Sequence, residues 1–157
     1  MKKGRVAVIG VGNLDRGDDA AGRQVARRLR EAGGGEAEIV DLDGEATSIL
    51  SALEKAEVAF LIDACISRGP AGAIHRYDLI DGLPAAAHFG LSSHGFGLAE
   101  AIELAKTLGQ LPTHSVVYAI EGECFDIGAP LSDAVAHAVE EVAMQVAEEI
   151  RALKRSA

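Results

Sequence analysis

The chain of 157 residues is 48% hydrophobic and only 4% aromatic, and its formal net charge is −9. This length allows one domain with its own core, whereas the acidic balance and the scattered lysines and arginines exclude a nucleic-acid-binding surface built on clustered cations. No apolar run is long enough to span a bilayer, so we expect a cytoplasmic protein with reduced thiols at Cys65 and Cys124.

The predicted elements alternate between short apolar strands and amphipathic helices. Strand patterns cover residues 5–11, 37–42, 58–64, 72–79 and 114–122, and helical patterns cover about 18–32, 46–56, 96–109 and 131–154. The last helix is the clearest, because apolar residues recur at steps of three and four from Leu131 to Leu153, with Ser132 as its predicted N-cap. This alternation predicts an α/β fold: a three-layer α/β/α sandwich with a twisted, mostly parallel sheet of about five strands. We expect a single domain over residues 1–157.

The stretch "GVGNLDRGDDAAG" (10–22) joins the first strand to the first helix. A dinucleotide fingerprint would need a third glycine where Asp15 stands, and the carboxylates of Asp15, Asp18 and Asp19 would repel a pyrophosphate. Two interpretations remain. The acids favour the helix N-terminus through its dipole, or one of them holds a cation at the carboxyl end of the first strand.

Two further residues point to the same edge of the sheet. Asp63 ends the apolar run "FLIDAC", and His94 precedes a helix in "SSHGFGLAE". Each has a simpler interpretation as a turn residue. Together with Asp19, however, they form a plausible three-ligand set for a transition metal with room for an exogenous ligand. We assign no site to the remaining histidines, which are His75, His88, His114 and His137.

Nucleophilic alternatives are weaker. Cys65 follows a buried strand, where cysteine is commonly a small hydrophobic residue, and no nearby cation is evident to lower its pKa. Ser92 and Ser93 lack the Gly-x-Ser-x-Gly setting of a hydrolase elbow. Residues 81–97 form the longest stretch without clear periodicity, which is typical of a functional or loosely ordered loop.

These motifs resemble the hydrogenase maturation proteases, the endopeptidases that trim the large subunit of nickel–iron hydrogenases. The matching pieces, in order along the chain, are "GVGNLDRGDDAAG", "LIDA" (61–64), "GPAG" (69–72), "SSHGFGLAEAIELAKTLGQLP" (92–112) and "APLSDAV" (129–135). The resemblance places the metal-contacting positions of the family on Asp19, Asp63 and His94. It also implies a twisted, mainly parallel sheet between helices.

The resemblance implies an activity and a partner. We expect a hydrolase that removes the C-terminal propeptide of a nickel–iron hydrogenase large-subunit precursor after nickel insertion, and that recognises the bound nickel. Asp19, Asp63 and His94 would carry both metal contact and catalysis, and Asp15 and Asp18 are second choices that shape the turn. The nickel would come with the substrate, and no organic cofactor is expected. The acid of the substrate-discriminating loop falls on either Asp41 or Asp43 in "DLDGEAT" (41–47).

Two rival functions stay open at this point. One is a non-hydrolytic nickel-sensing or binding module of the same fold, and the other is a nucleotide-binding α/β protein. We expect a monomer that binds neither nucleic acid nor membrane.

Overall fold

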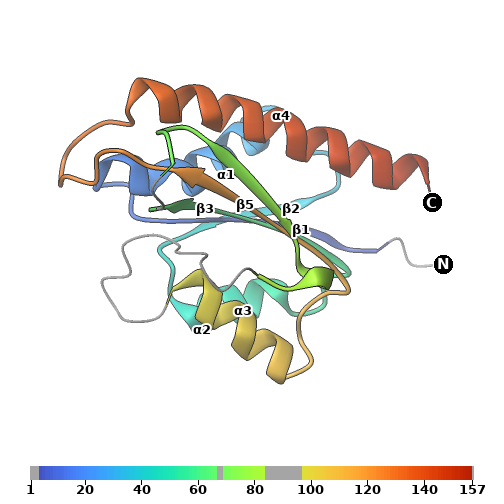
Figure 1. Cartoon of the computed structure of the whole chain (residues 1–157). Coiled ribbons are helices and arrows are strands. Elements are labelled where there is room, and N and C mark those ends of the chain that lie inside the picture. Colours follow the sequence, from blue (N-terminus) through green and yellow to red (C-terminus); the bar gives the residue numbers. More distant parts are fainter. Residues whose placement is uncertain (1–3, 67–68, 84–96, 157) are drawn as a thin grey trace.

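The computed structural model describes residues 4–66, 69–83 and 97–156. Helices cover both faces of a central sheet, as Figure 1 shows. The strands are β1 (Val6–Val11), β2 (Glu38–Leu42), β3 (Val58–Cys65), β4 (Ile74–Asp78) and β5 (His114–Glu121). The helices are α1 (Ala21–Glu31), α2 (Ala46–Leu53), α3 (Leu98–Thr107) and α4 (Asp133–Arg155), with short 3₁₀-helices η1 (Gly17–Ala20) and η2 (Leu79–Asp81). The predicted three-layer α/β/α fold is confirmed.

The order of the strands across the sheet is β2-β1-β3-β5-β4. All neighbouring pairs are parallel except β4 and β5, which are antiparallel. The chain moves outward from β1 to β2 and then returns to place β3 on the other side of β1. The carboxyl ends of β1 and β3 therefore flank the point where strand order reverses, which is where open α/β sheets bind ligands.

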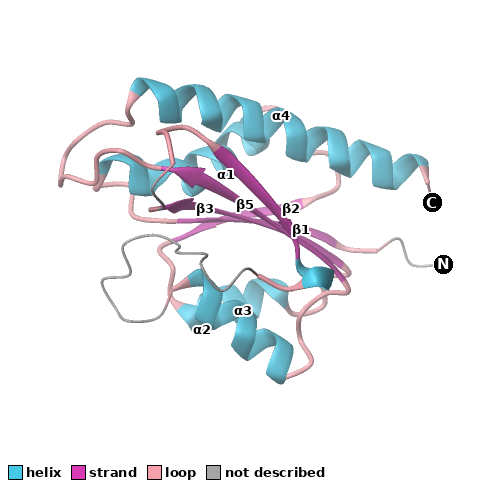
Figure 2. Ribbon diagram, in the orientation of Figure 1, coloured by secondary structure: helices cyan, strands magenta, loops and turns pink. Residues whose placement is uncertain are grey.

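Alternating strand residues fill two separate cores, one on each face of the sheet. Figure 2 shows in cyan the helices that cover these two faces. One core packs against α1 and α4 and contains Val8, Phe60, Ile62, Val116 and Tyr118. The other packs against α2 and α3 and contains Ile9, Leu61, Val117 and Cys65. The strands are apolar on both faces because helices cover both, as expected for a mainly parallel sheet. Among the described residues, no helix is both long and apolar enough to cross a membrane.

Two helix starts differ from the sequence-based expectation. The helix predicted from residue 18 begins as the 3₁₀-helix η1, and regular α-helix starts only at Ala21. Ser132 occupies the predicted N-cap position of α4, but its side chain makes no capping hydrogen bond. Its hydroxyl donates instead to the carboxylate of Asp18, 3.0 Å away.

Close contact between the backbone of α1 and the sheet depends on two glycines. A Cβ at Gly22 would lie 2.2 Å from the carbonyl oxygen of Ile62 and 2.5 Å from that of Val11. A Cβ at Gly10 would lie 2.2 Å from the carbonyl oxygen of Gly22. Any side chain at either position would push the first turn of α1 away from β1 and β3, and would move the residues that precede it.

We predict that Gly22→Ala lowers the free energy of unfolding by about 3 kcal/mol, because the added methyl group overlaps two carbonyl oxygens. For a chain of this size that corresponds to a melting temperature lower by about 10 °C, measurable by circular dichroism. Gly109→Ala is the matched control. Gly109 has φ +69° and no atom within 4 Å of an added Cβ, so only backbone strain of about 1 kcal/mol is expected. Equal decreases in the free energy of unfolding for the two variants would contradict the explanation that the methyl group at residue 22 overlaps the sheet.

Candidate functional site

Two of the three predicted ligand residues come together at the carboxyl ends of β1 and β3. Asp19 lies in η1, after the turn that leaves β1, and is 5% exposed; Asp63 lies near the end of β3 and is 4% exposed. One oxygen of Asp19 accepts the backbone N–H of Asn13 at 3.0 Å. One oxygen of Asp63 accepts the N–H of Ala64 at 2.8 Å. The backbone therefore orients both carboxylates.

The charge of Asp19 affects the protonation of Asp63. Burial raises the pKa of Asp63 well above its usual range, and the nearby negative charge of Asp19 raises it further. The hydrogen bond from Ala64 opposes these effects without overcoming them. A pair of acids in this state is poised to share a proton or to bind a cation, since either would relieve the repulsion.

The third predicted ligand, His94, lies outside the described residues, as does His88. Of the other histidines, His137 is exposed on α4, and the ring of His114 at the start of β5 meets Phe60 edge to face. His75 on β4 is different, because its Nε2 lies 2.9 Å from the carboxylate of the buried Glu121.

Asp18, a second choice in the sequence, has a structural role. Its fully buried carboxylate accepts the backbone N–H groups of Glu123, Cys124 and Ser132 and the hydroxyl of Ser132, at 2.7–3.0 Å. Burial alone would raise the pKa of Asp18, but these donors lower it below its usual value. Asp18 therefore fixes η1, and with it Asp19, to the segment between β5 and α4.

The rest of the first motif lends no support to a nucleotide site. Asp15 is exposed, and its backbone N–H donates to the side chain of Asn13 at 2.9 Å. Gly12 has φ +151°, and a Cβ there would lie 1.9 Å from the carbonyl oxygen of Asp19. The turn thus packs tightly against η1. A phosphate-binding loop presents backbone N–H groups at this position, whereas here the buried carboxylate of Asp19 occupies it.

The structure distinguishes the two candidate acids of the 41–47 segment. Asp41 forms ion pairs with Arg23 and Arg30 at 2.9 Å and with Arg27 at 3.5 Å. Partial burial would raise the pKa of Asp41, but the hydrogen bonds and charges of these arginines lower it. Asp43 is exposed, and one of its oxygens accepts the N–H of Glu45 at 3.1 Å. Asp41 thus joins β2 to α1, while Asp43 stays at the surface.

The thiol of Cys65 is unsuited to nucleophilic attack. Burial, together with the charges of Glu121 and Asp63, raises the pKa of Cys65 to about 12. Sequence analysis did not single out Glu121, which is fully buried at the end of β5. The signal was present, because an acid at the end of a long apolar strand is the pattern that identified Asp63.

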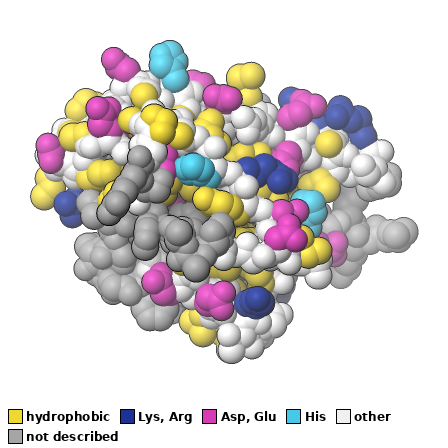
Figure 3. Space-filling view, in the orientation of Figure 1, with side chains coloured by type: hydrophobic (Ala, Val, Ile, Leu, Met, Phe, Trp, Pro, Cys, Tyr) yellow, Lys and Arg dark blue, Asp and Glu magenta, His cyan; other side chains and the backbone are white. Residues whose placement is uncertain are grey.

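Figure 3 shows one face of the molecule, on which lysine and arginine side chains lie in several places. Acidic side chains are interspersed among them over the same face.

Solved structures of hydrogenase maturation proteases share this fold along nearly the whole chain. The NiFe hydrogenase maturation protease HybD from Thermococcus kodakarensis has a TM-score of 0.74 at 24% identity, covering 93% of this chain and 98% of that one. HycI from Thermococcus kodakarensis KOD1 has a TM-score of 0.69 at 25% identity, covering 94% and 92%. The hydrogenase maturating endopeptidase HybD from E. coli has a TM-score of 0.72 at 20% identity, covering 98% and 94%. The comparison with curated protein sequences gives no match.

The architecture thus defines the class, an α/β/α protein with the fold of maturation endopeptidases. A sequence profile described as hydrogenase maturation protease, HycI, matches residues 22–149, which is more than half of the chain. The chain belongs to the hydrogenase maturation protease family and is a peptidase. Asp63 and His94 lie inside the matched range, and Asp19 lies three residues before it.

We predict that Asp18→Asn lowers the free energy of unfolding at neutral pH by about 3 kcal/mol, since an amide cannot accept all the hydrogen bonds that converge on the carboxylate. The folded pKa of Asp18 lies below 3.8, so its contribution is present above that pH and is lost as the pH falls through the folded pKa. Denaturant titrations of both proteins should therefore differ at neutral pH and converge in acid. The exposed Asp15→Asn is the control, and a comparable loss there would refute the structural role of Asp18.

Asp63→Asn should raise the free energy of unfolding at neutral pH by about 1 kcal/mol or more, because it removes a buried charge that faces Asp19. The folded pKa of Asp63 is raised, so the wild type loses stability as the pH rises from 3.8 through that folded pKa. The advantage of the variant should accordingly disappear in acid. Thermal melts at both pH values test this, with the exposed Asp126→Asn as control. A destabilised Asp63→Asn protein at neutral pH would contradict the electrostatic assignment.

Proposed function

We propose that this peptidase removes the C-terminal propeptide of a nickel–iron hydrogenase large-subunit precursor after nickel has been inserted. In this proposal Asp19, Asp63 and His94 contact the nickel of the precursor and carry the activity. The nickel arrives with the substrate and leaves with the product, and no organic cofactor takes part. The reaction belongs to the cytoplasm, and a monomer carries it out.

The observation that supports the proposal most directly is the buried pair of carboxylates. Asp19 and Asp63 are nearly inaccessible, and the charge of Asp19 contributes to raising the pKa of Asp63. Keeping two like charges together in a buried position is unfavourable for folding, so a function that uses them is the better explanation. A divalent cation presented by the substrate would neutralise the pair and dock the precursor at the same time.

The hydrolysis step requires a water molecule and a proton acceptor. Water attacks the scissile carbonyl carbon, the C–N bond breaks, and the amine of the propeptide takes up a proton. We assign Asp63 as the acceptor of the proton from water, since its raised pKa makes it a stronger base than an ordinary aspartate. The nickel of the substrate supplies the complementary chemistry by polarising the carbonyl or the water.

Substrate discrimination falls to Asp43 in this proposal. Asp41 is occupied by three arginines, so replacing it would release α1 from β2 before it changed any contact with the precursor. Asp43 is exposed and carries no ion pair among the described residues. It can therefore contact a bound protein without loss of internal structure.

The test is the intact mass of a hydrogenase large-subunit precursor from the same source, co-expressed in nickel medium with the wild type or with variants. We expect the wild type to release a discrete C-terminal peptide. Asp19→Asn, Asp63→Asn and His94→Ala should reduce the rate by about 10²–10⁴-fold, the usual range for loss of a group that transfers protons. Asp15→Asn and His137→Ala replace exposed residues of the same types and should cleave normally.

Stability separates loss of function from loss of fold in this experiment. Asp63→Asn is predicted to fold at least as well as the wild type, so its failure to cleave would implicate the carboxylate itself. An uncut, nickel-loaded precursor in the presence of the wild type would overturn the proposal in favour of a non-hydrolytic nickel-binding module. Stabilisation of the chain by NAD or ATP but not by nickel would instead favour the nucleotide-binding rival.

A further inference from the structure

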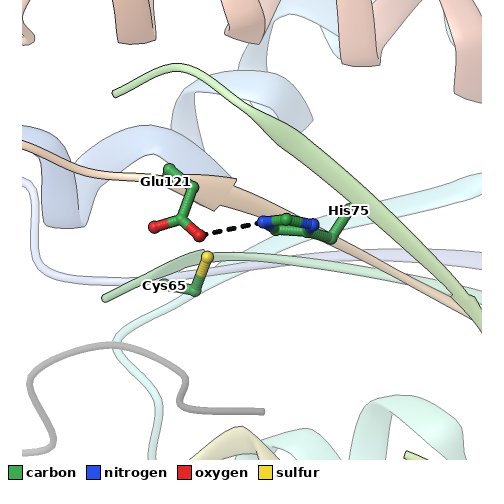
Figure 4. A group of neighbouring side chains, drawn as sticks. All are labelled: Cys65, His75 and Glu121. Atoms are coloured by element: carbon green, nitrogen blue, oxygen red, sulfur yellow. Dashed lines mark hydrogen bonds and ion pairs between the residues drawn. The ribbon is translucent and has the colours of Figure 1, made fainter. Parts of the chain in front are cut away.

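Three side chains outside the acid pair converge at the ends of three different strands. Cys65 ends β3, Glu121 ends β5, and His75 lies near the start of β4. One ligand atom from each of the three lies within 4.8 Å of the other two. Figure 4 shows the thiol, the imidazole and the carboxylate pointing toward one another.

The sheet register creates this convergence. Cys65 is directly opposite Glu121 in the parallel pair of β3 and β5, and His75 is opposite Ala119 in the antiparallel pair of β4 and β5. Because side chains alternate along a strand, all three face the same side of the sheet as Ala119, toward α2 and α3. Because β4 is antiparallel to β5, its first residues lie at the edge of the sheet where β3 and β5 end. This places the imidazole of His75 beside Cys65 and Glu121.

Backbone hydrogen bonds to the segment before β4 fix the position of Glu121. Its N–H donates to the carbonyl of Ala73 at 2.9 Å, and its own carbonyl accepts the N–H of Gly72 at 2.8 Å. Its carboxylate is fully buried and lies 2.9 Å from Nε2 of His75. The side chain is thus held in place rather than free to turn toward solvent.

The geometry points to a second metal site, in which Cys65, His75 and Glu121 bind a borderline divalent transition-metal ion such as Zn²⁺. Thiolate, imidazole and carboxylate are the three ligand types that zinc uses in proteins, whereas Mg²⁺ and Ca²⁺ take oxygen ligands. Zinc bonds of about 2.0–2.3 Å bring ligand atoms about 3.5 Å apart, so small side-chain movements complete the site.

Charge balance supports a divalent ion at this buried position. One thiolate and one carboxylate together cancel the charge of Zn²⁺, and a neutral imidazole adds none, so the occupied site carries no net charge into the interior. Binding releases the thiol proton to solvent. The side chain of His75 is 37% exposed, which gives the ion a route from the surface. Three protein ligands leave a fourth position for water or an exogenous ligand.

Co²⁺ is the probe, since it replaces Zn²⁺ in such sites and gives a near-ultraviolet sulfur-to-cobalt charge-transfer band only when a thiolate binds it. We expect this band when the full chain is titrated with Co²⁺ under a non-thiol reductant, and we expect Zn²⁺ to abolish it. His75→Gln should weaken Co²⁺ binding on the order of 100-fold, and Cys65→Ser should remove the band. Circular dichroism checks that each variant is folded. If the Cys65→Ser protein does not fold, the His75→Gln protein still tests the site, because His75 is partly exposed.

Three control variants make the result specific. His137→Gln and Cys124→Ser replace the same residue types elsewhere and should keep both band and affinity. Asp19→Asn should also keep the band, because the acid pair contains no sulfur. The same variant is expected to lose cleavage, so the cobalt titration tests the second site independently of the proposed nickel contact. Absence of the band in the wild type, its loss in Cys124→Ser, or unchanged affinity in His75→Gln would each overturn the proposal.

Discussion

The arrangement at the carboxyl edge of the sheet depends on how closely the start of α1 approaches β1 and β3. Gly10 and Gly22 allow this approach, because a methyl group at either position would overlap backbone atoms. Gly12 allows the next step, in which the turn folds tightly against the carbonyl of Asp19. Without these contacts η1 would stand away from β3, and Asp19 would lie in water rather than beside Asp63.

That closeness accompanies opposite environments for two buried aspartates, Asp18 and Asp63. Asp18 is surrounded by donors, so its charge is stabilised and it joins distant parts of the chain. Asp63 receives one backbone hydrogen bond and faces the charge of Asp19, so its ionised form is disfavoured. The first arrangement is typical of a structural acid, and the second of a functional acid that awaits a cation or a proton. Burial alone would not distinguish them.

Much of the fold follows from local patterns, and the rest depends on distant contacts. The strands and helices could be predicted because their apolar periodicity is strong. The position of Asp63 near the end of a buried strand could be predicted because its carboxyl group interrupts an apolar run. The antiparallel direction of β4 was also within reach, since residues 66–73 are too few for a crossover helix. The different roles of Asp18 and Asp19 were not, because the donors to Asp18 lie 105 or more positions away. The cluster of Cys65, His75 and Glu121 likewise appears only once three strands are in register.

The link between Asp18 and Ser132 also determines how late η1 can be fixed in place during synthesis of the chain. The residues that hold η1 in place are translated long after Asp18, the first of them 105 positions later. A nascent chain that has completed β1, α1 and β3 therefore already contains both acids but lacks the clamp that orders η1. The 3₁₀-helix η1 therefore gains these hydrogen bonds only after the segment leading into α4 has left the ribosome.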